Sequence, residues 1–278
     1  MLSAIINIIN MFKSGINSGH YYRVFNQTIK KAFGEYYMLH YPLYKNDGND
    51  LFQCQKNLTD YCLGLLPCLT EKNILEVGCG NGIQAMYIYE KYAPASIIGI
   101  DLNEDNINIA NMEKEKQNSQ NIEFLISDAQ ELSPIKSNSM DVVINIESAC
   151  HYPEKGKFLR EIYRVLKPGG RFVIADILTK KYPGNRKNFW EKKMKFYHWS
   201  LDRYKLSIPK SGLNVETCKD ITQDVLKGFK VCSSWIKNCR NIHLKSYMRI
   251  WGKIMLALNA YLLKKRRTYH IFAGMKPI

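Results

Sequence analysis

The stretch ILEVGCGNG, from Ile74 to Gly82, joins a run of apolar residues to three glycines at alternate positions. The apolar run predicts a buried strand over 73–77. Gly78, Gly80 and Gly82 predict a tight turn in which no Cβ atom stands between the backbone and a ligand lying across it. Their spacing differs from the Gly-x-Gly-x-x-Gly dinucleotide fingerprint because position 83 is Ile. This spacing alone is a weak signal, so the flanking pattern decides the fold.

Short apolar runs alternate with segments of helical periodicity from residue 73 onward. Strands that are apolar throughout and separated by helices predict a parallel sheet covered on both faces, which is a doubly wound α/β fold. The tetrapeptide KPGG at 167–170 predicts the turn into the fifth strand. The predicted strands occupy 73–77, 96–101, 121–126, 140–146 and 171–177, and the predicted helices occupy 83–92, 104–117 and 154–166.

Acidic residues stand at the ends of the first three predicted strands. Glu76 precedes the glycine turn, Asp101 closes the second strand, and Asp128 follows the third. Ligands of open α/β sheets bind at the carboxyl ends of the strands, so these side chains are expected to face one site. We expect Asp101 to accept hydrogen bonds from both hydroxyls of a ribose, and Asp128 to accept one from the exocyclic amine of adenine.

Charge divides the chain into two unlike halves. Residues 1–150 hold 11 Lys and Arg against 17 Asp and Glu, whereas residues 151–278 hold 29 against 8, which together give the net charge of +15. The basic half either faces an anionic partner, such as phospholipid headgroups, nucleic acid or an acidic substrate, or is a solvated surface. The eight cysteines show no Cys-x-x-Cys pair and no zinc-site spacing, which predicts no metal site and a cytoplasmic location.

Two apolar runs, at 1–12 and 254–263, bear on membrane contact. Both fall short of the roughly 20 residues needed to cross a bilayer, and the first lacks the basic start and cleavage site of a secretory signal. The second is preceded by Arg249 and Lys253 and followed by KKRR at 264–267, as interfacial amphipathic helices often are. Peripheral membrane association through the basic half is therefore one hypothesis, and a buried core helix with a charged exit is the other.

Four segments within 73–176 resemble, in this order, the class I S-adenosylmethionine-dependent methyltransferases: ILEVGCGNG, GIDL, ISDAQELSPIKSNSMDVVINIES and FLREIYRVLKPGGRFVIAD. The resemblance implies a Rossmann-like seven-stranded sheet and S-adenosyl-L-methionine as the cofactor. It also implies that the methionine moiety lies on the glycine turn, that Asp101 holds the ribose, and that Asp128 and Ala129 hold the adenine. The cofactor-binding residues that we expect are Glu76, Gly78, Cys79, Gly80, Gly82, Asp101, Leu102, Asp128, Ala129 and Asn145.

The segment NIESACHYPEKGKFLREIYRVLKPGG, at 145–170, is similar to the branch that contains the phthiotriol and phenolphthiotriol dimycocerosate methyltransferases, which O-methylate a lipid hydroxyl. It is also similar to the Glu-x-x-x-His segment of sterol C-methyltransferases. In the lipid enzymes a His commonly follows the Glu by three residues, where this chain has Cys150, and His151 comes one place later. The resemblance implies O-methylation of a hydrophobic small molecule or lipid, with C-methylation of an isoprenoid or sterol-like substrate as the alternative.

A hydroxyl acceptor has to lose a proton during methyl transfer. His151, after the fourth strand, is the expected general base because the pKa of an imidazole lies near neutral pH, and Glu147 is the expected orienting residue or second acid. Alternatively, His151 only closes the substrate wall. His198, in the aromatic stretch FYHWSLDRY at 196–204, is a second candidate, although such a cluster is also typical of a cap core.

The flanking segments predict how the site is covered. We expect a helical N-terminal cap segment at 1–50, in which Tyr36, Tyr37 or Tyr41 closes the site, and a methyltransferase domain at 51–278. The expected parts of that domain are a substrate cap at 178–212, a sixth strand at 213–222, a helical insertion at 222–263 and an antiparallel seventh strand at 267–277.

Two further functions compete with small-molecule methylation. A nucleic-acid methyltransferase would account for the basic half, but the chain shows no Asn-Pro-Pro-Tyr-type motif after the fourth strand and no recognisable RNA-binding module, so no specific nucleic-acid partner is expected. A non-catalytic binding module of the same fold is the other alternative.

Overall fold

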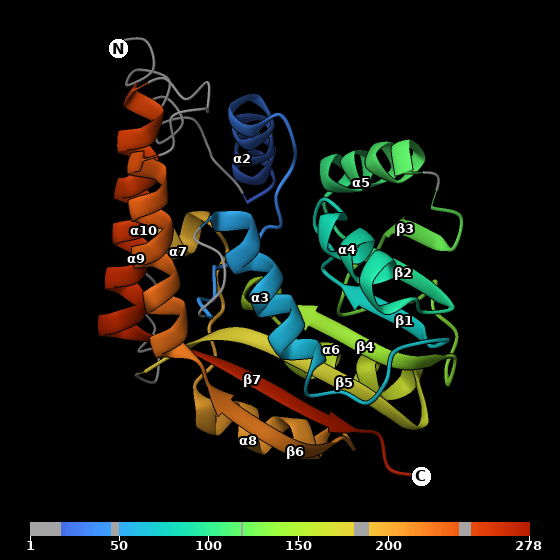
Figure 1. The fold of residues 1–278 in the computed structure, drawn as a ribbon. Coiled ribbons are helices and arrows are strands. Elements are labelled where there is room, and N and C mark those ends of the chain that lie inside the picture. The colour runs from blue at the N-terminus through green and yellow to red at the C-terminus, as the bar shows by residue number, and fades with distance from the viewer. Residues whose placement is uncertain (1–17, 46–49, 118, 181–188, 239–245) are drawn as a thin grey trace.

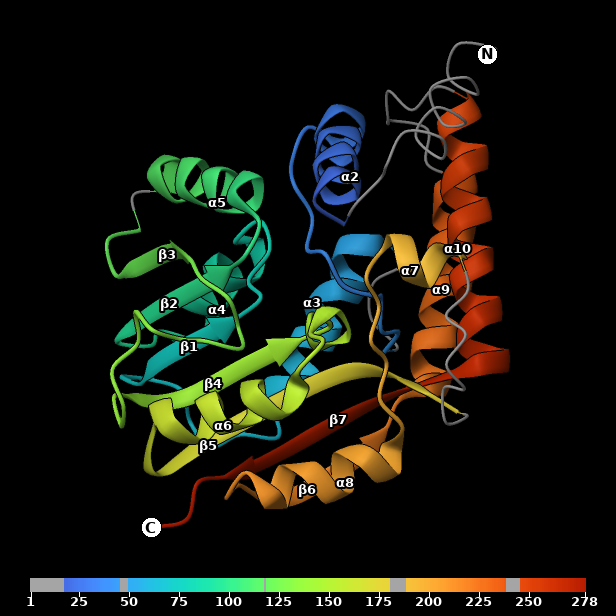
Figure 2. The same ribbon diagram turned by 180° about the vertical axis from the view of Figure 1, so that it is seen from behind.

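The computed structural model describes residues 18–45, 50–117, 119–180, 189–238 and 246–278. A seven-stranded sheet runs through the molecule with helices on both faces (Figures 1 and 2). The strand order is β3-β2-β1-β4-β5-β7-β6, in which β1 to β5 run parallel and β7 runs antiparallel to β5 and β6. The strands are β1 (Asn73–Val77), β2 (Ser96–Asp101), β3 (Ile122–Ile126), β4 (Met140–Ile146), β5 (Leu166–Thr179), β6 (Asn214–Asp220) and β7 (Arg267–Met275).

Two hydrophobic cores lie on the two faces of the sheet. The helices that contribute to the first core are α3 (Leu51–Leu63), α4 (Ile83–Tyr92), α5 (Glu104–Gln117), α9 (Thr222–Asn238) and α10 (Ser246–Arg266). The helices that contribute to the second are α6 (Lys155–Val165) and α8 (Leu201–Lys210). The other helical elements are α2 (Ser18–Phe33), the short α7 (Phe189–Lys193) and a 3-10 turn at Ala149–His151 after β4.

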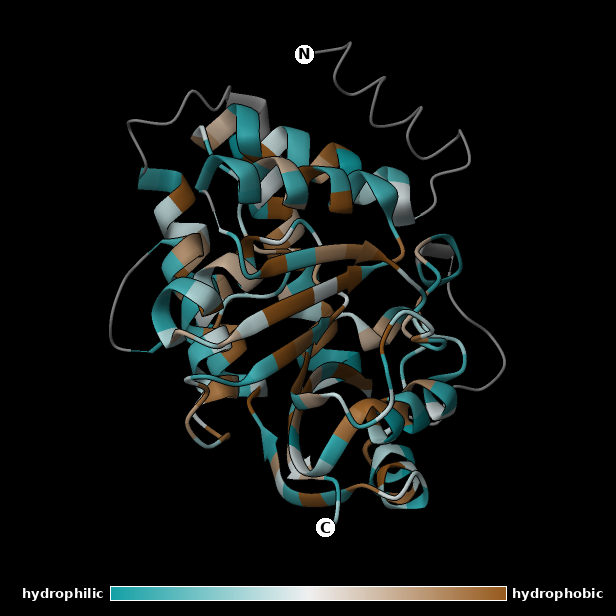
Figure 3. Ribbon diagram, turned by 90° about the vertical axis from the view of Figure 1, so that its right-hand side faces the viewer, coloured by the Kyte–Doolittle hydropathy of each residue, from teal (hydrophilic) through white to brown (hydrophobic). Residues whose placement is uncertain are grey.

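The central strands are apolar on both sides because helices cover both faces. Ile74, Leu75 and Val77 of β1 are fully buried, and Figure 3 shows hydrophobic residues concentrated along the strands while the outer helices are largely hydrophilic. Charge supports the helices as well. In α5, for example, Glu104 lies in the first turn and two lysines lie in the last, which complements the helix dipole.

The structure confirms the predicted strands, helices and antiparallel last strand, with one difference at β5. This strand begins at Leu166, so the predicted turn KPGG lies inside it. Met140 pairs with Leu166 but Val142 pairs with Arg171, and Gly169 has a positive φ of 75°. The turn is therefore an irregularity that interrupts the pairing of β5 with β4 and does not precede the strand.

The covering segments are only partly described. The apolar run at 1–12 lies outside the described residues. Helices α9 and α10 occupy the segment in which a helical insertion is expected, whereas α8, in the expected substrate cap, packs beside β6 and α6. The division into caps and domain stays a prediction. Within the described ranges, the structure contains no helix that is both long enough and apolar enough to span a bilayer.

Candidate active site

A cavity of about 930 Å³ lies at the carboxyl ends of β1, β2, β3 and β4. The turns that follow these strands line it, together with residues of α2 and the segment Met38–His40. The topology thus brings side chains from distant parts of the sequence to one edge of the sheet, as expected for this class of fold. Ten of the thirteen residues expected at the site line this cavity: Glu76, Gly78, Cys79, Gly80, Asp101, Leu102, Asp128, Ala129, Glu147 and His151.

The glycine turn after β1 has positive φ angles at all three glycines. A Cβ atom at Gly78 would collide with the side chain of Ser148, and one at Gly80 would lie 2.8 Å from a methyl carbon of Leu39. A Cβ atom at Gly82 would lie 2.6 Å from the Cβ of Ala110 on α5. Neighbouring protein side chains thus already require glycine at these positions. Of the three glycines in this turn, Gly78 and Gly80 line the cavity, where their backbone remains accessible to a ligand.

Asp101 ties the glycine turn to the end of β2. Its Oδ2 accepts a hydrogen bond from the backbone N–H of Gly80 (3.0 Å), and its Oδ1 accepts one from the N–H of Asn103 (2.8 Å). Burial raises the pKa of Asp101, and these two hydrogen bonds oppose that rise. Nδ2 of Asn106 also donates to Oδ1, at 3.5 Å. A carboxylate offers about four acceptor positions, so Oδ2 can still accept a hydroxyl hydrogen bond from a ligand. This geometry fits a hydroxyl of a ribose.

Glu76 is a buried carboxyl in the cavity wall. Its Oε1 accepts a hydrogen bond of 2.6 Å from Nε2 of Gln84, while its Oε2 finds no hydrogen-bond partner among the residues that the structure describes. Burial raises the pKa of Glu76 to about 8. A buried polar atom without a partner is costly, so it indicates a group that a ligand would satisfy. The amine of a bound amino-acid moiety has the donors that this oxygen lacks.

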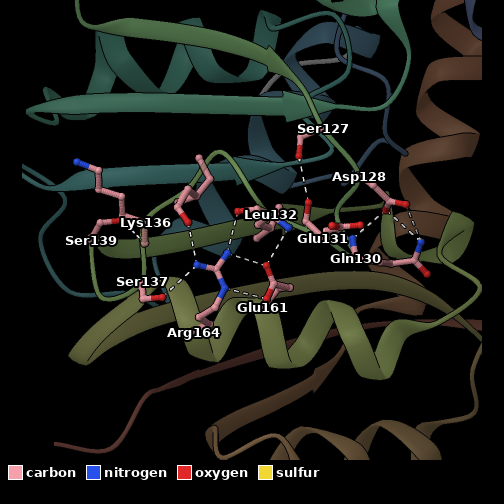
Figure 4. Close-up of polar contacts among 11 residues, drawn as sticks. Ser127, Asp128, Gln130, Glu131, Leu132, Lys136, Ser137, Ser139, Glu161 and Arg164 are labelled. Carbon is pink, nitrogen blue, oxygen red and sulfur yellow. Dashed lines mark hydrogen bonds and ion pairs between the residues drawn. The ribbon is translucent and has the colours of Figure 1, made fainter.

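The loop after β3 carries Asp128 and Ala129 and is fixed by α6 (Figure 4). Oδ1 of Asp128 accepts a hydrogen bond from the backbone N–H of Gln130 (2.8 Å), which closes a local turn. Arg164 on α6 donates to the carbonyl oxygens of Leu132 and Ile135, both at 2.8 Å. Arg164 therefore fixes the loop to α6. Asp128 and Ala129, the two residues predicted to contact adenine, line the cavity.

Glu147 follows β4 in an unusual backbone conformation. Its φ is 58°, in the left-handed region that side-chain-bearing residues rarely adopt. Its Oε2 accepts a hydrogen bond of 2.8 Å from the backbone N–H of Tyr41. Burial raises the pKa of Glu147 to about 8, so this carboxyl is largely protonated at neutral pH. The N-terminal segment and β4 are thus joined at a strained, partly buried acid in the cavity wall.

His151 is hydrogen-bonded on both ring nitrogens. Its Nδ1 lies 3.1 Å from the carbonyl oxygen of Met194, and its Nε2 lies 3.0 Å from the hydroxyl of Tyr22 on α2. A carbonyl only accepts, so Nδ1 carries the hydrogen and Nε2 accepts from the Tyr22 hydroxyl. Burial lowers the pKa of His151 to about 4 and raises that of Tyr22 well above its ordinary value. The imidazole is therefore neutral and the phenol protonated at neutral pH.

Tyr22 was missed by sequence reasoning, because it lies 129 residues from His151 and no local motif marks it. The tyrosines that were expected to close the site do not line the cavity. Tyr37 stacks on Phe52, with ring centroids 5.1 Å apart, and the hydroxyl of Tyr41 donates to Asn259 on α10. The rings of Tyr37 and Tyr41 therefore pack outside the cavity and support the residues that line it.

Three predicted site residues do not line the cavity either: Gly82, Asn145 and His198. Asn145 is fully buried and donates to the carbonyl oxygen of Val77 at 2.9 Å, which ties β4 to β1. Nδ1 of His198 lies 2.8 Å from the carbonyl oxygen of Ile177, and burial lowers the pKa of this histidine well below its ordinary value. Asn145 and His198 thus hydrogen-bond to strands of the sheet, and the direct roles expected of them stay predictions.

Comparison with known proteins agrees with this geometry. A family model described as a methyltransferase domain matches residues 70–254. The chain is 31% identical over 213 residues to the phthiotriol/phenolphthiotriol dimycocerosates methyltransferase of Mycobacterium leprae, covering 75% of this chain and 71% of that protein. It is 30% identical over 214 residues to the 27-O-demethylrifamycin SV methyltransferase of Amycolatopsis mediterranei, covering 74% and 76%.

A solved structure shares the fold. The phosphoethanolamine N-methyltransferase 2 of Haemonchus contortus, in complex with S-adenosylhomocysteine, aligns with a TM-score of 0.72 at 19% identity, over 80% of this chain and 53% of that one. The family match covers β1 to β6, the glycine turn and the three acidic strand ends, whereas β7 lies beyond the matched residues. The chain therefore belongs to the methyltransferase domain family and is an S-adenosylmethionine-dependent methyltransferase with the seven-stranded class I fold.

Proposed function

We propose that this protein transfers a methyl group from S-adenosyl-L-methionine to a hydroxyl of a hydrophobic small molecule or lipid. The observation that carries the proposal is the pairing of His151 with Tyr22 in the wall of a cavity that also contains the glycine turn and Asp101. The two relatives named above are called methyltransferases of a lipid and of an O-demethylated rifamycin. Their names support an O-linked methyl group and a large acceptor.

The cavity residues fit the parts of S-adenosyl-L-methionine. Asp101 would hold the ribose, the loop at Asp128 and Ala129 would hold the adenine, and Glu76 would meet the amine of the methionine moiety beside the glycine turn. The bound cofactor supplies an electrophilic methyl group on a sulfonium with a good leaving group. Much of the rate acceleration then comes from holding the acceptor in line with that methyl group.

The acceptor hydroxyl has to give up its proton, and two groups in the wall can take it. Nε2 of His151 is a neutral acceptor whose lone pair faces Tyr22, so an acceptor hydroxyl either replaces the Tyr22 hydroxyl or donates to it. Glu147 is the alternative base, because a carboxyl with a pKa of about 8 is partly ionised near neutral pH and is then a stronger base than an ordinary carboxylate. We assign His151 the leading role because of its hydrogen-bonded geometry.

The cavity is large enough to take an acceptor, and apolar residues form one part of its largely polar wall. A volume of about 930 Å³ lies at the upper end of the range for ligand pockets, so it has room for the cofactor and part of a second molecule. Met38, Leu39, Ile146, Tyr152 and Tyr197 contribute carbon surface to the wall. We propose further that the chain works in the cytoplasm at the periphery of a membrane, where such an acceptor would be dissolved.

The test uses labelled S-adenosyl-L-methionine with a panel of long-chain alcohols, hydroxylated isoprenoids and hydroxylated polyketides. We expect label in an organic-soluble product whose new methyl carbon has the NMR shift of a methyl ether. His151→Ala should lose about a hundredfold or more of turnover and still bind S-adenosylhomocysteine. Undiminished turnover in that variant would refute the base assignment. A product with a carbon-bound methyl group would show that the reaction is C-methylation and not O-methylation. Glu147→Gln would then be the next variant to assay.

A further inference from the structure

Helix α10 carries an apolar face that no other part of the described chain covers. Its large apolar side chains Ile250, Ile254, Leu258 and Tyr261 are between 46% and 59% exposed. Their spacing of four, four and three residues places all four on one side of the helix. On another side of the same helix, Leu263 is buried in the core and Asn259 accepts a hydrogen bond of 2.7 Å from the hydroxyl of Tyr41. The helix is therefore already held in place while its outer face stays apolar and exposed.

Positive charge accompanies this face. Helices α9 and α10 pack against each other at one end of the molecule, far from β3 and α5 (Figures 1 and 2). Together they contain eight Lys and Arg residues and a single acidic residue, Asp224. Four of the basic residues on α10 have exposed side chains: Lys253, Lys264, Lys265 and Arg266. On an ideal helix Lys253 and Lys264 flank the apolar face on one side, and Lys265 lies close to Tyr261 at its end.

We propose that the exposed face of α10 docks on the surface of an anionic lipid bilayer. The inference rests on the proposed function in one respect: an acceptor dissolved in lipid would explain why the enzyme docks on a membrane. A helix lying in the interface buries its apolar side chains at the boundary between headgroups and acyl chains, while lysines at its edges meet anionic headgroups. The exposed face of α10 offers both the apolar side chains and the flanking lysines on one helix.

Two other occupants fit the same face less well. Nucleic acid would satisfy the lysines, but its phosphates offer nothing to Ile254 and Leu258. A second copy of this chain, docked by the same helix, would bring one set of lysines towards the other. An anionic bilayer complements the charge and the apolar side chains together.

Docking through α10 also bears on the active site. The Tyr41–Asn259 hydrogen bond joins α10 to the segment that includes Met38, Leu39 and His40, and these three residues line the cavity. The helix that meets the bilayer thus also supports one wall of the acceptor site. An apolar acceptor would then be taken from the membrane next to the wall that receives it.

The test measures co-sedimentation of the full-length protein with vesicles of phosphatidylcholine, with and without phosphatidylserine. We expect binding to the phosphatidylserine vesicles that weakens as salt is raised. Ile254→Glu/Leu258→Glu should bind at least about tenfold more weakly, because it puts charge where apolar side chains would be buried. Leu206→Glu is the matched control, since Leu206 is 62% exposed but lies on α8, and it should bind like the unmodified protein.

Each of the other outcomes would overturn the docking proposal. Equal binding by the double variant and the control would show that α10 is not the contact. Failure of the unmodified protein to bind vesicles would show that the face has another occupant, and a dimer in solution that the double variant disrupts would identify a second copy of the chain. Binding to RNA in place of vesicles, retained by the double variant, would assign the charge to nucleic acid. Calorimetry with S-adenosylhomocysteine on the same samples separates these results from a failure of the methyltransferase proposal, because cofactor binding should be unchanged in every variant.

Discussion

The partly buried carboxyl of Glu147 should make the stability of this protein depend on pH in a specific window. Its pKa is about 8 in the folded state against 4.5 in the unfolded chain. Below pH 4.5 both states hold the proton, and as pH rises towards 8 only the folded state keeps it, so stability falls. Integrated from pH 7 to pH 8, one such group lowers the free energy of unfolding by about 1 kcal/mol. Glu76, whose pKa is also about 8, adds a similar amount.

Between pH 7 and pH 8, the change in stability comes mainly from the carboxyls of Glu147 and Glu76. Burial lowers the pKa of His151 and of His40 to about 4, so histidines change stability mainly below pH 6.5 and in the opposite direction. Glu147→Gln imitates the protonated carboxyl and keeps an acceptor for the N–H of Tyr41. We expect the loss of stability between pH 7 and pH 8, measured by urea unfolding, to shrink by about 1 kcal/mol in this variant.

Glu161→Gln is the matched control for this prediction. The pKa of Glu161 is held low by its hydrogen bond with Arg164, so this carboxyl is ionised in both states throughout the window. Its replacement should therefore leave the change between pH 7 and pH 8 as it is in the unmodified protein. A Glu147→Gln variant with the same pH dependence as the unmodified protein would refute the burial argument for this site.

Two further substitutions test the supports of the cavity. Gly82→Ala should lower the free energy of unfolding by about 2 to 4 kcal/mol, because φ is positive and the new Cβ would lie 2.6 Å from that of Ala110. Gly156→Ala, where a Cβ makes only an ordinary contact, should not destabilise, and equal effects of the two in denaturant unfolding would contradict the packing argument. Arg164→Met should lower stability by about 1 to 2 kcal/mol and speed amide exchange in the loop after Asp128. Unchanged exchange there would show that the loop does not depend on this contact.

The parts of the site that sequence could predict are those set by local pattern. The order of the strands along the chain locates the apolar run of β1, the glycines after it, and the acids Asp101 and Asp128. The parallel topology then brings the ends of these strands together. Asn145 shows the limit of this reasoning. It belongs to a strand whose neighbours line the cavity, but its side chain donates to β1 and does not line the cavity.

The remaining features depend on contacts between distant segments. The partner of His151 is Tyr22, 129 residues earlier, and the partner of Glu147 is the backbone of Tyr41. These contacts withdraw both side chains in part from solvent, which lowers the pKa of the histidine and raises that of the carboxyl. Sequence suggested a base of ordinary pKa at His151, and only burial by α2 and the N-terminal segment changes that expectation.

The most direct test of the account is a calorimetric titration of the purified protein with S-adenosylhomocysteine, beside Asp101→Ala and Asp141→Ala. Asp141 is a matched control because it also accepts a backbone hydrogen bond, from the N–H of Asn73, but does not line the cavity. We predict binding by the unmodified protein and by Asp141→Ala, and a loss of about a hundredfold in affinity in Asp101→Ala. Equal affinity in all three proteins, or no binding by the unmodified one, would contradict the assignment of this cavity to the cofactor.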